Sequence, residues 1–140
     1  MLLKPIGIIH SPYKVSGDAP RQGRYSELPM ELEIYEEYLE GLKDVDRATH
    51  LIVLHWLHHA RRDLLQVRTP HRGEVRGVFA CRSPVRPNPI AFNVVKLLEM
   101  KGNRLTVQGL DALDGSPLLD LKPYYSDLDS IPGIKDSWLK

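Results

Sequence analysis

The chain has 140 residues, of which 42% are hydrophobic and one is cysteine, and its formal net charge is +1. Its length predicts one domain, residues 1–140, while its apolar content argues against general disorder and its near-zero charge against an indiscriminate polyanion binder. No apolar run approaches the about 20 residues of a membrane helix, no signal peptide is visible, and a lone cysteine excludes an internal disulfide, so we expect a cytoplasmic protein without a membrane partner.

The predicted elements are short, and most of them are strands. Apolar residues recur at helical spacing only over Tyr35–Val45, which predicts one helix. Ser16–Ser26 has the composition of a loop, and Lys101-Gly102-Asn103 is a turn signal between two strand patterns. This succession favours a mainly β fold, an antiparallel barrel or sandwich with one short helix and long functional loops, over a Rossmann sheet. In chain order, the predicted strands are Lys4–His10, Glu31–Tyr35, Thr49–Leu57, Glu74–Arg82, Asn93–Met100, Arg104–Leu110 and Leu118–Tyr125.

The net charge hides an uneven distribution along the chain. Residues 27–46 carry eight carboxylates against one lysine, whereas residues 61–86 carry seven arginines against two carboxylates. Two solvated faces of opposite sign would explain this pattern, and so would an anion-binding surface beside a counter-charged one. A localised arginine-rich surface is compatible with a nucleic-acid partner even though the total charge is close to zero.

The densest motif is the segment Arg82–Ile90 (RSPVRPNPI). Its three prolines fix φ and remove three backbone donors, which predicts a stiff loop rather than a central strand or a helix interior. A stiff loop lowers the entropy cost of holding its polar side chains in place, which favours a functional over a purely structural loop. Those polar side chains are Arg82, Ser83, Arg86 and Asn88.

A second motif runs over Leu113–Tyr124 (LDGSPLLDLKPY) and begins with the turn signal Asp114-Gly115. On the strand that follows, alternate positions place three polar side chains on one face and two leucines on the other. The polar row indicates either the wall of a site or an ordinary solvent face. The polar set, which supplies the candidate catalytic residues, is Asp120, Lys122 and Tyr124, and the apolar set is Leu119 and Leu121.

Three histidines near the end of a predicted strand raise the question of a metal. On a strand, His55 and His59 face one way and His58 the other, which is poor geometry for three ligands. Cys81 lies in an apolar strand pattern, which indicates a small buried side chain rather than a ligand or a nucleophile. The sequence therefore predicts no metal site, and histidines that lie at the rim of a pocket.

Together these motifs resemble one family. The chain carries SPY, PRQ, GVFACRSPVRPNPI and LDGSPLLDLKPYYSD in the order of the TsaA-like, or TrmO, family, and the resemblance runs from Ile6 to Asp127. It implies a single-sheet antiparallel β-barrel, S-adenosyl-L-methionine as methyl donor without a metal, and a homodimer. It also implies tRNA N6-methyltransferase activity on threonylcarbamoyl-adenosine, with the anticodon arm of tRNA as partner. Bacterial members have a further C-terminal region, so the chain resembles a short form.

The resemblance also carries site residues onto the matching positions of this chain. Asp114 becomes the candidate to hold the sulfonium cation, and Asp120 or a histidine the candidate general base. The implied substrate-binding residues are Arg86, Asn88 and Lys122, of which Arg86 and Lys122 are the candidates for the threonylcarbamoyl carboxylate. The implied cofactor-binding residues are Pro20, Arg21, Gln22, His58, His59, Arg82, Phe92, Leu113, Asp114, Gly115 and Ser116.

Two alternative functions stay open. One is an S-adenosyl-L-methionine-dependent methyltransferase with another acceptor. The other is a non-catalytic barrel that binds RNA or a nucleotide. The clustering of polar groups in a proline-stiffened loop argues against the second alternative. So does the aromatic content of 7%, because bare RNA-binding barrels stack bases on surface aromatic side chains.

Overall fold

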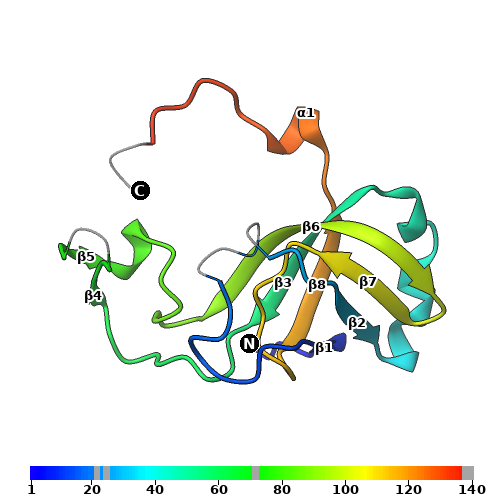
Figure 1. Cartoon of the computed structure of the whole chain (residues 1–140), viewed down its shortest axis with the longest axis horizontal. Helices are drawn as coiled ribbons and strands as arrows, with labels where there is room; N and C mark the ends of the chain where they lie inside the picture. Colours follow the sequence, from blue (N-terminus) through cyan, green and yellow to red (C-terminus); the bar gives the residue numbers. More distant parts are fainter. Residues whose placement is uncertain (21–22, 24–25, 71–72, 137–140) are drawn as a thin grey trace.

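Six antiparallel strands close into a β-barrel in the order β1-β2-β7-β6-β3-β8 (Figure 1). The computed structural model describes residues 1–20, 23, 26–70 and 73–136. The mainly β class and the single-sheet antiparallel barrel are thereby confirmed, and the six barrel strands correspond to six of the seven predicted strands. They are β1 (Gly7–His10), β2 (Met30–Ile34), β3 (His50–Trp56), β6 (Ile90–Lys101), β7 (Arg104–Gln108) and β8 (Pro117–Pro123).

The longest strand, β6, gives the barrel its curvature. Its first half pairs with β3, from Ile90 to Lys96, and its second half pairs with β7, from Lys96 to Lys101. The register shifts between Leu97 and Glu99, and such a bulge bends a strand and increases its twist. β8 then closes the barrel, because it pairs with β1 on one side and β3 on the other.

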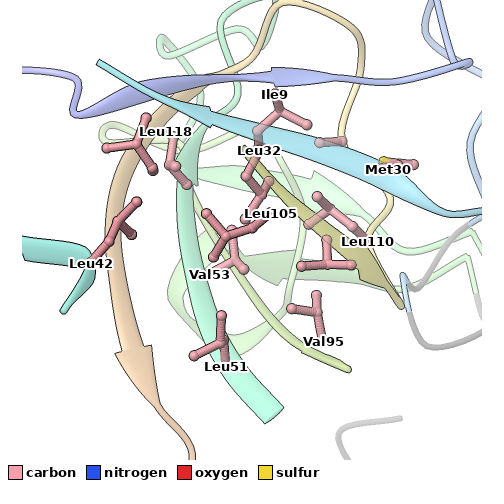
Figure 2. Close-up of a cluster of buried hydrophobic side chains, with 13 residues drawn as sticks. Ile9, Met30, Leu32, Leu42, Leu51, Val53, Val95, Leu105, Leu110 and Leu118 are labelled. Carbon is pink, nitrogen blue, oxygen red and sulfur yellow. The ribbon is translucent and has the colours of Figure 1, made fainter. Parts of the chain in front are cut away.

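The barrel interior is filled by the inward-facing side chains of all six strands (Figure 2). β2 and β7 show the alternation of buried and partly exposed residues that a strand with one core face requires. Full burial of one such aliphatic side chain stabilises the fold by about 1.5–3 kcal/mol. The buried cluster comprises Ile9, Met30, Leu32, Ile34, Leu42, Leu51, Val53, Val95, Leu105, Val107, Leu110, Ala112 and Leu118.

The helix predicted over Tyr35–Val45 is a 3-10 helix, η2 (Glu36–Leu42). The Tyr38 amide donates to Tyr35 O at 2.9 Å, the three-residue spacing of that helix type. Only Leu42 of this helix is fully buried, and Tyr38 packs half-buried against the core, so two side chains rather than a full stripe anchor the helix. The other described helices are also short: η3 (Val45–Arg47), η4 (Val78–Ala80) and α1 (Ser126–Asp129). No helix among the described residues is long and apolar enough to cross a membrane.

The strand predicted over Glu74–Arg82 is wrong in extent and in place. Only β5 (Val75–Gly77) is extended there, and it pairs with β4 (Gln66–Arg68) in a two-stranded sheet outside the barrel. The chain then turns into η4, whose Phe79 is 79% exposed. The apolar pattern suggested a buried strand, but Val75 and Gly77 of β5 are exposed, and Cys81 is half-buried after η4 instead of lying inside a core strand.

The alternation predicted for the last strand is broken by a bulge. Leu54 faces Asp120 and the next residue, His55, faces Leu118, so Leu119 is an extra residue in β8. Leu118 is therefore the fully buried leucine, with Leu121 packed against the core, whereas the sequence placed Leu119 and Leu121 on the apolar face.

Candidate functional site

A pocket of about 280 Å³ lies where four loops meet at one end of the barrel; we call it the mouth pocket. In an antiparallel barrel, the C-terminal ends of β1, β3 and β7 lie beside the N-terminal ends of β6 and β8. The loops at these ends therefore converge. The mouth pocket is lined by Ser16, Leu57, His58, His59, Ala60, Arg61, Pro84, Val85, Asp111, Leu113 and Ser116.

The mouth pocket brings together residues from separate sequence motifs. His58, His59, Leu113 and Ser116, four of the implied cofactor contacts, all line it, and the proline-rich segment supplies a further wall. Asp111 lines it as well, although no motif singled it out. The signal that could have indicated Asp111 is its place two residues before the Leu113–Ser116 turn, on the loop that leads from the barrel core into that turn.

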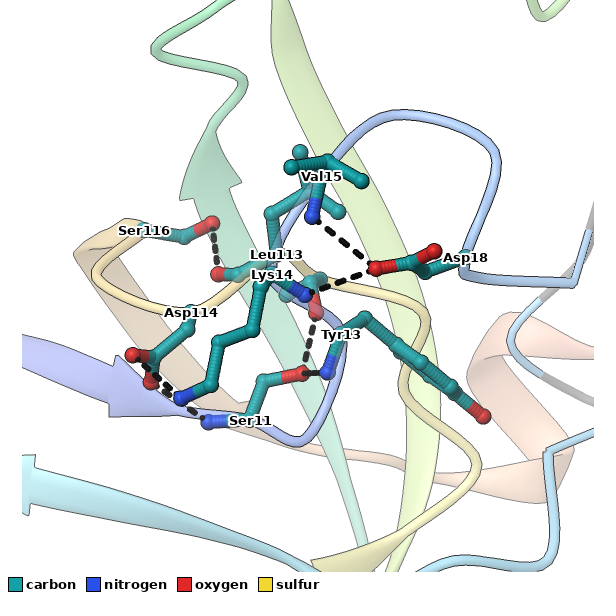
Figure 3. A network of polar contacts seen from close by, with 9 residues as sticks. Ser11, Tyr13, Lys14, Val15, Asp18, Leu113, Asp114 and Ser116 are labelled. Carbon is teal, nitrogen blue, oxygen red and sulfur yellow. Dashed lines mark hydrogen bonds and ion pairs between the residues drawn. The ribbon is translucent and has the colours of Figure 1, made fainter.

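The turn that carries Leu113 and Ser116 is fixed by the loop after β1 (Figure 3). Asp114 Oδ1 accepts from the Ser11 amide at 2.9 Å and Oδ2 accepts from Lys14 Nζ at 2.8 Å. The Lys14 ammonium, and after it the Ser11 amide, holds the pKa of Asp114 below its usual range. Asp114 is not among the residues that line the mouth pocket, so its implied contact with a sulfonium cation stays a prediction.

Further hydrogen bonds join residues 9–14 to the 112–116 turn. We call the full set of contacts between these two segments the clasp. Ser11 Oγ donates to Ala112 O at 2.7 Å, and the Asp114 amide donates to Tyr13 O at 2.7 Å. Gly115 has φ +82°, which favours glycine, and its amide donates to the strand β1. Asp114 and Gly115 thus fix the conformation of the turn, and this role does not depend on a ligand.

The three histidines do not converge on one point. The ring centroids of His58 and His59 lie 3.9 Å apart at the mouth pocket, whereas His55 is fully buried inside the barrel. Burial, and then the neighbouring His59, lowers the pKa of His58, which is therefore neutral at neutral pH. Within the described ranges, no group of three or more His, Cys, Asp or Glu side chains is arranged to hold a metal.

His55 of β3 is buried inside the barrel, not at the rim of a pocket as the sequence predicted, and pairs with Asn93 of β6. Its Nε2 donates to Asn93 Oδ1 at 2.9 Å, while its Nδ1 is buried and has no hydrogen-bond partner among the described residues. Burial is the largest influence on the ring and lowers its pKa; Asn93 and the charge of Asp111 oppose this effect, and His58 adds to it. His55 is therefore a neutral core residue in the folded protein.

We expect this neutral histidine to make the protein less stable as the pH falls below about 6.5, the pKa of an unfolded histidine. Between that value and the lower folded pKa, only the unfolded chain binds the proton. The free energy of unfolding then falls by up to about 1.4 kcal/mol per pH unit.

Urea denaturation between pH 7.5 and 5 measures this slope. His55→Gln should remove part of it, whereas His50→Gln, an exposed position on the same strand, should leave it unchanged. An identical slope in the wild type and His55→Gln would contradict the assignment.

Arg86 braces the proline-rich loop from within. Its Nη1 donates to Cys81 O at 3.1 Å and to Ser83 O at 2.9 Å. Ser83 Oγ in turn accepts from the Val85 amide at 3.1 Å, so the loop is tied to itself on both sides of its first proline. The guanidinium predicted to bind substrate thus also holds the wall of the mouth pocket in shape.

Arg62 braces the same loop from the segment after β3. Its Nε donates to Pro87 O at 2.7 Å and its Nη2 lies 3.4 Å from Asn88 Oδ1. The guanidinium also lies over the ring of Trp56, 5.1 Å from its centroid. No motif singled out Arg62; its only signal is its place in the arginine-rich stretch.

Two implied cofactor contacts lie on the outer face of β6 and not among the lining residues of the mouth pocket. Arg82 is exposed, and its guanidinium carbon lies 5.9 Å from the ring centroid of Phe92, which is itself 49% exposed. The predicted cofactor residues therefore fall on two surfaces of one chain.

The candidate catalytic residues of β8 lie on the wall of the barrel. Lys122 Nζ and Asp120 Oδ2 form an ion pair at 2.8 Å, with the Asp120 hydrogen bond raising the pKa of Lys122. Asp120 lines a second cavity, against η2, and none of these side chains lines the mouth pocket. Tyr124 is half-buried, and its amide donates to His50 O at 3.1 Å. Their catalytic role stays a prediction.

The glycine that follows the PRQ motif in the sequence packs closely against the barrel. Gly23 is buried, and a Cβ placed on it would lie 2.4 Å from Gly109 O and 2.6 Å from Asn93 Nδ2. Pro20 is half-buried. Arg21 and Gln22, two implied cofactor contacts, lie outside the described residues.

A model of the tRNA-methyltransferase O N-terminal domain family matches residues 8–130, a range that contains every loop of the mouth pocket. The chain belongs to this family. An S-adenosyl-L-methionine-binding protein of Archaeoglobus fulgidus is 51% identical over 131 residues, which cover 94% of this chain and 94% of that protein.

Other matches cover the relative only in part. A second Archaeoglobus fulgidus protein, named "Probable S-adenosyl-L-methionine-binding protein", is 54% identical over 138 residues, which cover 99% of this chain and 38% of that protein. The crystal structure of TrmO from Pseudomonas aeruginosa superposes with a TM-score of 0.82 at 30% identity, covering 99% of this chain and 62% of that chain. This chain therefore spans less than two thirds of the length of both proteins.

Proposed function

We propose that this chain is an S-adenosyl-L-methionine-dependent methyltransferase that methylates N6 of threonylcarbamoyl-adenosine next to the tRNA anticodon, and that it acts as a homodimer. The observation that carries the proposal is the mouth pocket, where family motif residues far apart in the sequence, such as His58 and Ser116, line one cavity. Relatives named for S-adenosyl-L-methionine binding support the choice of cofactor.

The residues of the mouth pocket fit the chemical groups of this cofactor. Leu57, Pro84 and Leu113 give apolar walls for an adenine ring, and Ser16 offers a partner for a hydroxyl group. The volume of about 280 Å³ is at the lower end of ligand sites, which span about 300–1,000 Å³. One pocket would thus hold only part of the cofactor, and the rest would need a further surface.

The cofactor supplies a methyl group on a cationic sulfur, and the protein aligns it with the acceptor and excludes water. The braced proline-rich loop suits this task, since Arg62 and Arg86 hold it from both sides. The acceptor nitrogen loses a proton. His58, neutral in the mouth pocket, has an imidazole nitrogen that can take it. We favour His58 over Asp120, because Asp120 is paired with Lys122 outside the pocket.

The arginine-rich stretch supports tRNA as the substrate, although part of its charge is neutralised locally. Arg61 pairs with Asp63 at 2.8 Å. Arg62, Arg68 and Arg82 are exposed, and their charges can face phosphates of the anticodon arm. A modest number of such contacts lets an enzyme release its tRNA after each reaction.

The outer face of β6 supports the homodimer. Ile90, Phe92, Val94 and Leu98 are all exposed there, and an apolar strand face of this kind is unusual on a free surface. In the homodimer that we propose, this face of one copy would supply Arg82 and Phe92 to the cofactor site of the other. This arrangement accounts for implied cofactor contacts on two separate surfaces of one chain.

Two measurements test the proposal. Calorimetry should detect S-adenosyl-L-methionine binding to the purified protein. Nucleoside mass spectrometry of total tRNA from a strain without the gene should show loss of N6-methylated threonylcarbamoyl-adenosine alone, restored by the wild-type gene. Binding with unchanged nucleosides would indicate another acceptor. Absence of binding at high protein concentration would contradict the methyltransferase.

A further inference from the structure

The mouth pocket contains one carboxylate among its described lining residues, that of Asp111. No hydrogen bond or ion pair with another described residue engages this carboxylate, which is half-buried. Its charge opposes the effect of burial on the pKa of His55, so the carboxylate lies within electrostatic reach of that buried ring. An unpaired, half-buried carboxylate is available to a ligand.

The other carboxylate of this loop is not available in the same way. Both oxygens of Asp114 are engaged, Oδ1 by the Ser11 amide and Oδ2 by Lys14 Nζ (Figure 3). Release of Asp114 toward a ligand would break the clasp that fixes the Leu113–Ser116 turn. The two aspartates of the sequence DALD therefore differ in role. Asp114 fixes the Leu113–Ser116 turn, and Asp111 lines the mouth pocket.

Among the described residues that line the mouth pocket, the other ionisable side chains do not compensate Asp111. Arg61 forms a bidentate pair with Asp63, through Nε at 3.0 Å and Nη2 at 2.8 Å. His58 is neutral at neutral pH because burial and the adjacent His59 lower its pKa. The pocket therefore presents a negative charge to whatever occupies it, and this charge favours a cation.

We propose that Asp111 is the residue by which the mouth pocket distinguishes cationic S-adenosyl-L-methionine from its neutral product S-adenosyl-L-homocysteine; this rests on the proposed function. The two ligands share the adenosine, the amino group and the carboxylate. They differ in the methyl group and in the positive charge of the sulfur. A carboxylate near that sulfur stabilises only the methyl donor, so affinity for the ligand falls once the methyl group has left.

Calorimetry of both ligands with wild type and Asp111→Asn tests the proposal. The amide keeps the shape of the side chain and removes its charge. We expect Asp111→Asn to weaken S-adenosyl-L-methionine binding by about tenfold, which is about 1.4 kcal/mol, and S-adenosyl-L-homocysteine binding by less than about twofold. Retained product binding also reports an intact pocket.

Two further variants separate charge from shape. Asp114→Asn should weaken both ligands to the same extent, because it loosens the clasp. Asp46→Asn, on the exposed helix η3, should change neither. An equal loss of both ligands in Asp111→Asn, or no change in either, overturns the assignment while leaving the proposed function intact. A wild type that binds neither ligand overturns the proposed function and this inference with it.

Discussion

Gly7→Ala is expected to lower the free energy of unfolding by about 3 kcal/mol, the upper part of the range for overpacked sites. A Cβ placed on Gly7 would lie 2.1 Å from Glu33 O and 3.0 Å from Glu33 C, both backbone atoms of the paired strand β2. These atoms cannot move away from β1 without separating two strands of a closed barrel. The loss should therefore affect the whole fold and not one loop.

Urea denaturation measures this loss, and the chain offers a matched control. Gly41 in η2 has nothing within 4 Å of the place where its Cβ would lie, so Gly41→Ala should leave stability unchanged or raise it by about 0.4–1 kcal/mol. Equal denaturation midpoints for Gly7→Ala and the wild type would show that β1 and β2 separate readily.

Gly23→Ala is expected to weaken S-adenosyl-L-methionine binding by about tenfold or more, at a cost to stability of about 1 kcal/mol. The new Cβ would lie 2.4 Å from Gly109 O and 2.6 Å from Asn93 Nδ2, so the residue cannot keep its place against the barrel mouth. The implied cofactor contact Pro20 lies three positions before Gly23 and is half-buried. None of the three atoms nearest to the new Cβ belongs to the buried hydrophobic cluster, so most of the effect falls on the ligand.

Calorimetry and urea denaturation of the same variant separate the two effects. Gly77→Ala serves as control, because Gly77 lies in the exposed β5 with open space around its Cβ direction. It should preserve both affinity and stability. Unchanged affinity in Gly23→Ala would mean that the PRQ loop does not contribute to the site.

The barrel strands were predictable because each carries its own signal. Thr49–Leu57 has the continuous apolar run of a strand buried on both faces, and β3 covers nearly the same residues. Glu74–Arg82 shows a similar local pattern but has no barrel neighbour to pair with, and pairing is a property of the whole chain. The bulge at Leu119 escaped prediction for the same reason, since it arises from the register against β3.

The lining of the mouth pocket was predictable where sequence motifs supply it and not where packing does. His58, His59 and the Leu113–Ser116 turn stand in recognisable motifs, and the mouth pocket brings them together. Asp111 and Arg62 have no such signal. Asp111 is the free carboxylate among the described lining residues because Asp114 is already engaged by the Ser11 amide. Arg62 braces the proline-rich loop because Pro87, 25 positions further along the chain, lies within hydrogen-bond distance of it.

The clasp between the loop after β1 and the turn before β8 also bears on when the pocket forms. Lys14 and Asp114 are 100 positions apart, and Ser16 and Leu113 line the mouth pocket from the two joined segments. During synthesis, the histidines and arginines of the site leave the ribosome well before the turn that must enclose them. A nascent chain thus carries most of the side chains that line the mouth pocket before the cavity exists, and the cavity forms only after the 112–116 turn has been synthesised.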